Sequence, residues 1–189
     1  MSVPTVAALY VDPDGVYANQ PGVEVWDEAR DARLYAGPWP VVAHPPCKSW
    51  SQMGNCRPLT RAGGDGGTFS AALAVVERYG GVLEHPALTR AWRTFNLPKV
   101  ATHGWNIALY GRPGWATEID QAVYGHPCHK LTWLYYVGPK PPKLDWRERN
   151  TGRRVADDGG GGRDQRSRTP PAFRDVLLEM ARSASRVAV

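Results

Sequence analysis

The sequence predicts an α/β fold, in which helices cover the faces of one β-sheet, from three observations. Short apolar runs with strand-forming residues alternate along the chain with segments of helical periodicity. Turns rich in Gly and Pro separate these segments. The chain of 189 residues, of which 42% are hydrophobic, is long enough to bury one sizeable core.

Strands are expected where short apolar runs end in turn residues. The run from Trp133 to Val137 is rich in strand-forming residues, and Pro13, Asp14 and Gly15 provide the turn after the first run. The expected strands are at residues 6–12, 23–26, 41–43, 82–84, 116–123 and 133–137.

Helices are expected between these strands and at the end of the chain. Asp27 and Thr68 are suitable N-caps, and Gly80 with Gly81 provides a stop. The expected helices are at residues 27–34, 68–79, 88–95 and 170–184.

The chain is expected to have three parts: an α/β core at 1–138, a basic connector rich in Pro, Gly and Arg at 139–168, and a C-terminal helix at 169–189 that packs on the core. The formal net charge is +5, and the connector holds nine basic and five acidic residues. Such a segment favours a polyanionic partner such as nucleic acid. A solvated basic loop is the alternative.

Several protein classes are excluded by composition. No apolar run approaches the roughly 20 residues of a membrane span, so no membrane partner is expected. The first residues lack the basic region of a secretory signal. Three cysteines do not make a disulfide scaffold, so we expect reduced thiols and a cytoplasmic protein.

Chemically active residues gather at three predicted strand ends, at 44–51, 84–86 and 124–130. In α/β sheets, functional groups lie just beyond the carboxyl ends of the strands. Two prolines fix the backbone before Cys47, and the neighbouring Lys48 favours a reactive thiolate. A buried structural cysteine is the alternative.

Metal ligation is a second use for the same side chains. The candidate ligands are His44, Cys47, Cys56, His126, Cys128 and His129. Because the sequence has no Cys-x2-Cys pair, no metal site is expected, and zinc is the minor alternative.

Taken together, the three motifs resemble the DNA (cytosine-5)-methyltransferase family. The segment Pro45-Pro46-Cys47-Lys48-Ser49-Trp50-Ser51 is similar to its nucleophile loop, Pro-Pro-Cys-Gln-x-Phe/Trp-Ser. Glu84-His85-Pro86 is similar to its Glu-Asn-Val strand end, and residues 124–138 to its Tyr-Gly-x-Pro-Gln-x-Arg-x-Arg segment. The resemblance implies a Rossmann-like methyltransferase-type sheet with flanking helices, truncated at the N-terminus.

The resemblance implies a covalent mechanism on a flipped pyrimidine. The Cys47 thiolate adds to C6, Glu84 holds the base edge, and Lys130, in place of the family's first Arg, orients the base or a phosphate. The implied partner is duplex DNA. The residues expected to contact it are Lys48, Ser49, Trp50, Ser51, Arg147, Arg149, Arg153 and Arg154.

The implied methyl donor is S-adenosylmethionine, which the family binds at a Phe-x-Gly-x-Gly turn. Here Asp12 and Gly15 lie in the candidate turn, and Asp27 or Glu28 would take the ribose hydroxyls. The chain before Cys47 is short, and only the connector stands in place of a target-recognition domain. A partner chain or a second copy of this chain is therefore expected to complete the site.

Two other functions remain open. One is a pyrimidine C5-modifying enzyme that uses the same thiolate with a different donor. The other is a non-catalytic descendant that binds nucleic acid or a partner. The presence of both Cys47 and Glu84 favours an enzyme.

Overall fold

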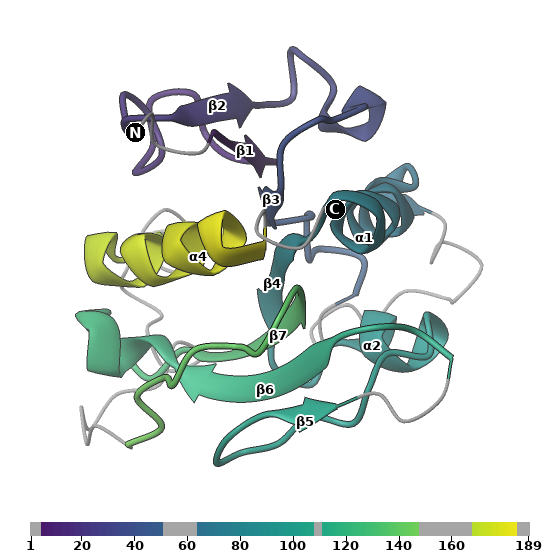
Figure 1. The fold of residues 1–189 in the computed structure, drawn as a ribbon. Helices are drawn as coiled ribbons and strands as arrows, with labels where there is room; N and C mark the ends of the chain where they lie inside the picture. Colours follow the sequence, from purple (N-terminus) through teal and green to yellow (C-terminus); the bar gives the residue numbers. More distant parts are fainter. Residues whose placement is uncertain (1–4, 51–63, 108–110, 148–167, 185–189) are drawn as a thin grey trace.

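The computed structural model describes residues 5–50, 64–107, 111–147 and 168–184. These residues form one seven-stranded mixed sheet in the order β2-β1-β3-β4-β7-β6-β5. Helices α1 and α4 lie on opposite sides of β3 and β4 (Figure 1). The predicted α/β class is therefore confirmed.

Four parallel strands form one half of the sheet, and three strands with antiparallel pairing form the other half. Their bounds are β1 Val6–Leu9, β2 Val23–Trp26, β3 Val41–Ala43, β4 Gly81–Pro86, β5 Asn106–Ile107, β6 Trp115–Asp120 and β7 Leu131–Val137. Because β7 is antiparallel to both β4 and β6, those two strands run in the same direction. The carboxyl ends of β1, β3, β4 and β6 therefore face one edge of the sheet.

Two long helices and several short ones complete the fold. They are α1 Thr68–Tyr79, α2 Arg90–Thr94, α4 Pro171–Ala184 and the 3-10 helices η1 Ala32–Leu34 and η4 Gln121–Tyr124. The apolar face of α1 contacts one side of the sheet, and that of α4 contacts the other. Within the described ranges, no helix has both the length and the apolar character needed to cross a bilayer.

Side chains of β4 alternate between these two cores. Val82 packs in the α4 core and Leu83 in the α1 core. Glu84 therefore faces the α4 side, whereas His85 faces the α1 side and lies edge-on to Phe69 at 5.2 Å between ring centroids. This alternation places one polar residue on each face of the sheet at its carboxyl edge.

The expected helix at 27–34 is wrong. The structure has a turn followed by the three-residue η1, because Asp31 adopts a left-handed backbone with φ of 51°. Asp27 does accept a hydrogen bond from the backbone N of Arg30, but this contact closes a turn and begins no α-helix. Short side-chain-to-backbone bonds of this kind compete with helix formation.

Other boundaries also moved for local reasons. The first strand ends at Leu9 because Tyr10 has a positive φ of 60°. The strand expected to reach residue 123 ends at Asp120. The Asp120 side chain accepts a hydrogen bond from the backbone N of Ala122 and so caps the start of η4. Thr68 is the first residue of α1 and not its N-cap. The side chain of Asp65 accepts the hydrogen bond from the Phe69 backbone N instead. Strand β5 was not expected.

Candidate active site

The structure brings together the three residues expected to be catalytic. Cys47 follows β3, Glu84 lies on the adjacent parallel strand β4, and Lys130 precedes β7, the other neighbour of β4. The charges of Glu84 and Lys130 both act on the Cys47 thiol. A nucleophile, a carboxylate and a cation thus share one edge of the sheet.

Glu84 is buried, with 9% of its surface exposed, and is held on both oxygens. His44 Nδ1 lies 2.9 Å from Oε2, and Gln121 Nε2 donates to Oε1 at 3.2 Å. Burial raises the pKa of Glu84, but the hydrogen bond and charge of His44, aided by Lys130, outweigh it and lower the pKa to about 2. The carboxylate is therefore ionised at neutral pH and acts as an acceptor.

Cys47 is a free, partly buried thiol. Burial raises its pKa, the negative charge of Glu84 raises it further, and Lys130 lowers it. The thiol of the unliganded protein is therefore mostly protonated at neutral pH. Formation of the thiolate requires removal of this proton while Lys130 stabilises the resulting charge.

Lys130 connects the site to the start of α4. Its Nζ donates to the backbone oxygen of Arg168 at 2.9 Å, and its backbone N donates to Asp120 at 2.9 Å. Burial lowers the pKa of the Lys130 ammonium, whereas Glu84 and Cys47 raise it. The ammonium is thus tied to the chain just before α4, and the charge of Glu84 favours its protonated form.

Tyr17 and His44 also belong to this site, although neither was expected in such a role. The Tyr17 hydroxyl lies 2.8 Å from His44 Nε2, on the side of the ring opposite Glu84. His44 was considered only as a metal ligand, and nothing in the sequence singles out Tyr17. The sequence feature that could have indicated a role for His44 is its position three residues before Cys47, in His-Pro-Pro-Cys.

The loop after Cys47 is anchored by Trp50. The indole is 4% exposed, packs against Phe69 and Phe95, and donates to Asp65 at 2.8 Å. Trp50 therefore anchors the loop and does not present its ring to a base. Lys48 is exposed and Ser49 partly exposed, whereas Ser51 lies outside the described residues.

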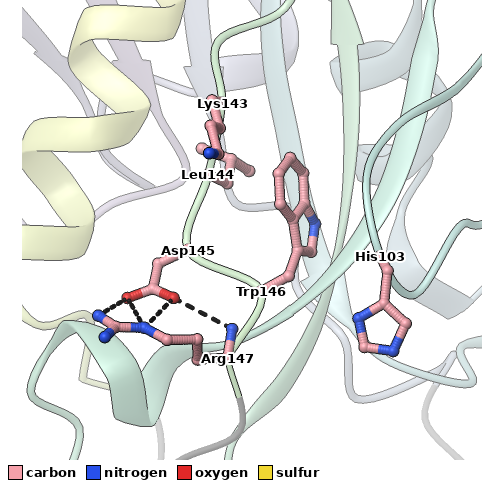
Figure 2. Close-up of a pocket in the computed structure, with 6 residues that line it drawn as sticks. All are labelled: His103, Lys143, Leu144, Asp145, Trp146 and Arg147. Carbon is pink, nitrogen blue, oxygen red and sulfur yellow. Dashed lines mark hydrogen bonds and ion pairs between the residues drawn. The ribbon is translucent and has the colours of Figure 1, made fainter.

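The described part of the connector forms a separate hollow of about 640 Å³, lined by His103, Lys143, Leu144, Asp145, Trp146 and Arg147 (Figure 2). The Arg147 guanidinium pairs with both oxygens of Asp145. Trp146 Nε1 donates to Thr117 on β6 at 2.9 Å. No catalytic candidate lines this hollow. The expected nucleic-acid contacts Arg149, Arg153 and Arg154 lie outside the described residues.

The residues expected to hold the methyl donor lie at the ends of the paired strands β1 and β2. Asp12 accepts the backbone N of Asp14, and Gly15 closes the same turn, since a Cβ there would lie 3.0 Å from Asp12 Cβ. The absence of a side chain at Gly15 thus makes room for its own turn. Asp27 and the exposed Glu28 offer carboxylate oxygens suited to ribose hydroxyls.

Among the described residues, no group of three or more His, Cys, Asp and Glu side chains is placed to hold a metal ion. His129 Nδ1 instead pairs with Asp120 at 2.5 Å, and His126 Nδ1 lies 2.8 Å from the Cys128 carbonyl oxygen. Cys56 lies outside the described residues.

The comparisons with known proteins do not place the chain in a family. No family model matches the sequence, and no curated protein matches it.

Proposed function

We propose that this protein is an enzyme that modifies cytosine at C5 in DNA, in the manner of a DNA (cytosine-5)-methyltransferase. The observation that carries the proposal is the convergence of Cys47, Glu84 and Lys130 at one edge of the sheet. Thiolate addition to a pyrimidine needs a nucleophile, a group that holds the base, and a charge that stabilises the thiolate.

The sheet supports a Rossmann-like, methyltransferase-type fold. Its parallel strands β2, β1, β3 and β4 are adjacent, and α1 and α4 cover the two faces. Open sheets of this kind bind ligands beyond the carboxyl ends of their parallel strands, where the candidate site lies.

In the proposed reaction, a cytosine leaves the stack and enters the site. Cys47 loses its proton, a bond forms between Sγ and C6, and the C5–C6 electron pair makes C5 nucleophilic. Ionised Glu84 accepts a hydrogen bond from the N4 amino group of the cytosine, and it accepts one from N3 only after N3 has taken up a proton from solvent as addition puts electron density on the ring. After C5 takes the new group, a base removes the C5 proton and the Sγ–C6 bond breaks.

The proposed donor is S-adenosylmethionine, which supplies an electrophilic methyl group when bound. Asp27 and Glu28 would hold its ribose hydroxyls at the end of β2. The turn at 12–17 gives no glycine cradle for the rest of the molecule, so a partner chain or a second copy of this chain would complete the pocket.

The proposed partner is duplex DNA in the cytoplasm. Two contacts beside residues 148–167 support it: Asp145 N donates to the Tyr124 hydroxyl, and Lys130 Nζ donates to the Arg168 carbonyl. Tyr124 follows β6 and Lys130 precedes β7, so both anchors lie toward the carboxyl edge of β6. Arg168, the last residue of the basic connector, therefore lies against Lys130 of the proposed site, and the net positive charge of the connector would attract phosphates.

Two modified duplexes test the proposal. A duplex with 5-fluorocytosine should give a stable covalent adduct only with S-adenosylmethionine, because fluorine at C5 blocks the final elimination. A duplex with 2-pyrimidinone, which is more electrophilic at C6, should trap Cys47 without any donor. The absence of an adduct with both duplexes would overturn the enzymatic proposal and leave a nucleic-acid-binding protein.

A second candidate is a C5-modifying enzyme with a different donor. The observation that favours it is the turn at 12–17, where Gly15 faces its own turn and the Tyr17 hydroxyl is engaged by His44. This enzyme would give an adduct with the 2-pyrimidinone duplex and none with 5-fluorocytosine and S-adenosylmethionine.

A further inference from the structure

We propose that His44, held in place by Tyr17, is a positioning residue that fixes the orientation and ionisation of Glu84. The three side chains form one hydrogen-bonded chain, from the Tyr17 hydroxyl to His44 Nε2 at 2.8 Å and from His44 Nδ1 to Glu84 Oε2 at 2.9 Å. The role of this chain in catalysis rests on the proposed function, in which Glu84 holds the base.

The three hydrogen-bonded side chains come from three neighbouring strands or from the segments that follow them. Tyr17 comes from the connection after β1, His44 follows β3, and Glu84 lies on β4, in the order in which these strands pair. Tyr17 is 2% exposed, and the side chains of His44 and Glu84 are 13% and 11% exposed. Because water hardly reaches these groups, their partners determine where they point.

The position of each proton follows from the charge on Glu84. An ionised carboxylate only accepts, so His44 Nδ1 must carry the shared proton and donate it. Burial and the charge of Glu84 raise the pKa of Tyr17 well above its usual value, so its hydroxyl keeps its proton. Tyr17 therefore holds the His44 ring from the opposite side.

The turn that carries Tyr17 is itself fixed by α4. Arg174 Nη1 donates to the Val16 carbonyl oxygen at 3.0 Å, and the Tyr17 and His44 rings lie 5.4 Å apart between centroids. The position of Glu84 therefore depends on the residues after β1 as well as on its own strand.

Other charged and titratable groups also face this chain. His85, Lys130 and Cys47 act on or respond to Glu84, and Arg174 and Asp175 act on Tyr17. Without His44, Lys130 and His85 would remain to favour the ionised carboxylate, while burial would oppose them. We therefore expect the loss of His44 to raise the pKa of Glu84 without abolishing its titration.

The experiment measures the Glu84 titration directly by carbon NMR of the labelled full-length chain, assigned with Glu84→Gln. His44→Ala should move the pKa of Glu84 from about 2 to above its ordinary 4.5. His44→Asn, whose side-chain amide can replace the Nδ1 donor but not the charge, should give a pKa below that of His44→Ala. Tyr17→Phe, which removes only the hydroxyl, should raise it by a smaller amount.

The pH profile of adduct formation with the 5-fluorocytosine duplex and S-adenosylmethionine links this titration to the reaction, because 5-fluorocytosine keeps the N4 amino group that ionised Glu84 accepts from and 2-pyrimidinone lacks it. The acid limb of the profile should move to higher pH in His44→Ala and should be partly restored in His44→Asn. An unchanged Glu84 titration in His44→Ala, or in Tyr17→Phe if His44→Ala does not fold, would overturn the inference. A shifted titration with an unshifted profile would also overturn it. If the wild-type protein forms no adduct, the proposed function fails, whereas the titration still decides whether His44 holds Glu84.

Discussion

The ammonium of Lys130 lowers the pKa of the Cys47 thiol from the far side of β4. Lys48 is adjacent to Cys47 in the chain, but its side chain is exposed, and an exposed charge is screened by water. The cation that stabilises the thiolate therefore comes from a different segment, more than eighty residues later in the sequence. This relationship can be measured without any substrate.

Replacement of Lys130 by Met should raise the pKa of the Cys47 thiol, because the lowering effect of the ammonium is removed while the Glu84 charge and burial remain. Iodoacetamide alkylation of Cys47, followed across pH, reports this pKa. At pH 8 the alkylation rate should fall below that of the wild-type protein, because a smaller fraction of the thiol is ionised. Lys48→Met is the matched control, and an equal change in both variants would contradict the assignment.

Replacement of Cys47 by Ala should abolish adduct formation with both modified duplexes. Loss of a covalent nucleophile should reduce turnover by at least about 10³-fold. Cys128→Ala is the matched control, because it removes the same functional group from a cysteine that is buried, with 3% of its surface exposed. Full activity in Cys47→Ala, or a loss confined to Cys128→Ala, would show that Cys47 is not the nucleophile.

Replacement of Glu84 by Gln should reduce the rate of adduct formation by roughly 10²-fold or more, since the amide keeps the shape but loses the charge that holds the base. Affinity for duplex DNA should change much less, because phosphate contacts dominate it. Adduct kinetics and a binding titration separate the two effects. Glu179→Gln on the exposed face of α4 is the control. An equal loss of rate and affinity would contradict a role confined to the base.

The elements predicted best are those with a strong local pattern. Strands β2 and β3 begin and end where expected, and α1 keeps its apolar face and its stop at Gly80. The helix predicted at residues 27–34 is absent, because the spacing of apolar residues does not indicate the left-handed backbone of Asp31 or the hydrogen bond that closes the turn at Asp27. The two-residue β5 depends on pairing with β6, which no local pattern shows.

The candidate site was predictable only where a motif marked it. Cys47 and Glu84 follow from strand-end motifs, and pairing of β3 with β4 places them side by side. The contacts of Tyr17 and Gln121 depend on the order of strands in the sheet, so no local sequence feature indicates them. Trp50 looked like a base-contacting residue because it lies in the loop, but long-range packing on Phe69 buries it.

The acid sensitivity of the fold should depend on Glu84. Its pKa is about 2 in the folded protein and 4.5 ordinarily, so the ionised form adds stability above pH 4.5. This contribution, on the order of 3 kcal/mol, is lost as the pH falls from 4.5 towards 2. Urea unfolding should therefore show a gap between wild type and Glu84→Gln that is largest at neutral pH and narrows over this window. A gap that stays constant with pH would contradict the low pKa.

Gly81 should be essential for the pairing of β3 with β4, and hence for the site. Its φ is 118°, and a Cβ at this position would lie 2.0 Å from the Val41 carbonyl oxygen. That contact is with backbone, so β3 would have to move away from β4. Gly81→Ala should lower the free energy of unfolding by at least about 3 kcal/mol and disrupt the approach of Cys47 to Glu84.

Gly104→Ala is the matched control for this last change, because Gly104 also has a positive φ, of 104°, but nothing lies within 4 Å of a Cβ there. It measures backbone strain alone, which costs on the order of 1–2 kcal/mol. Urea denaturation of both variants separates the strain from the clash. Equal destabilisation would show that close packing against Val41 does not require glycine, whereas a much larger loss in Gly81→Ala would show that the close approach of β3 and β4 does.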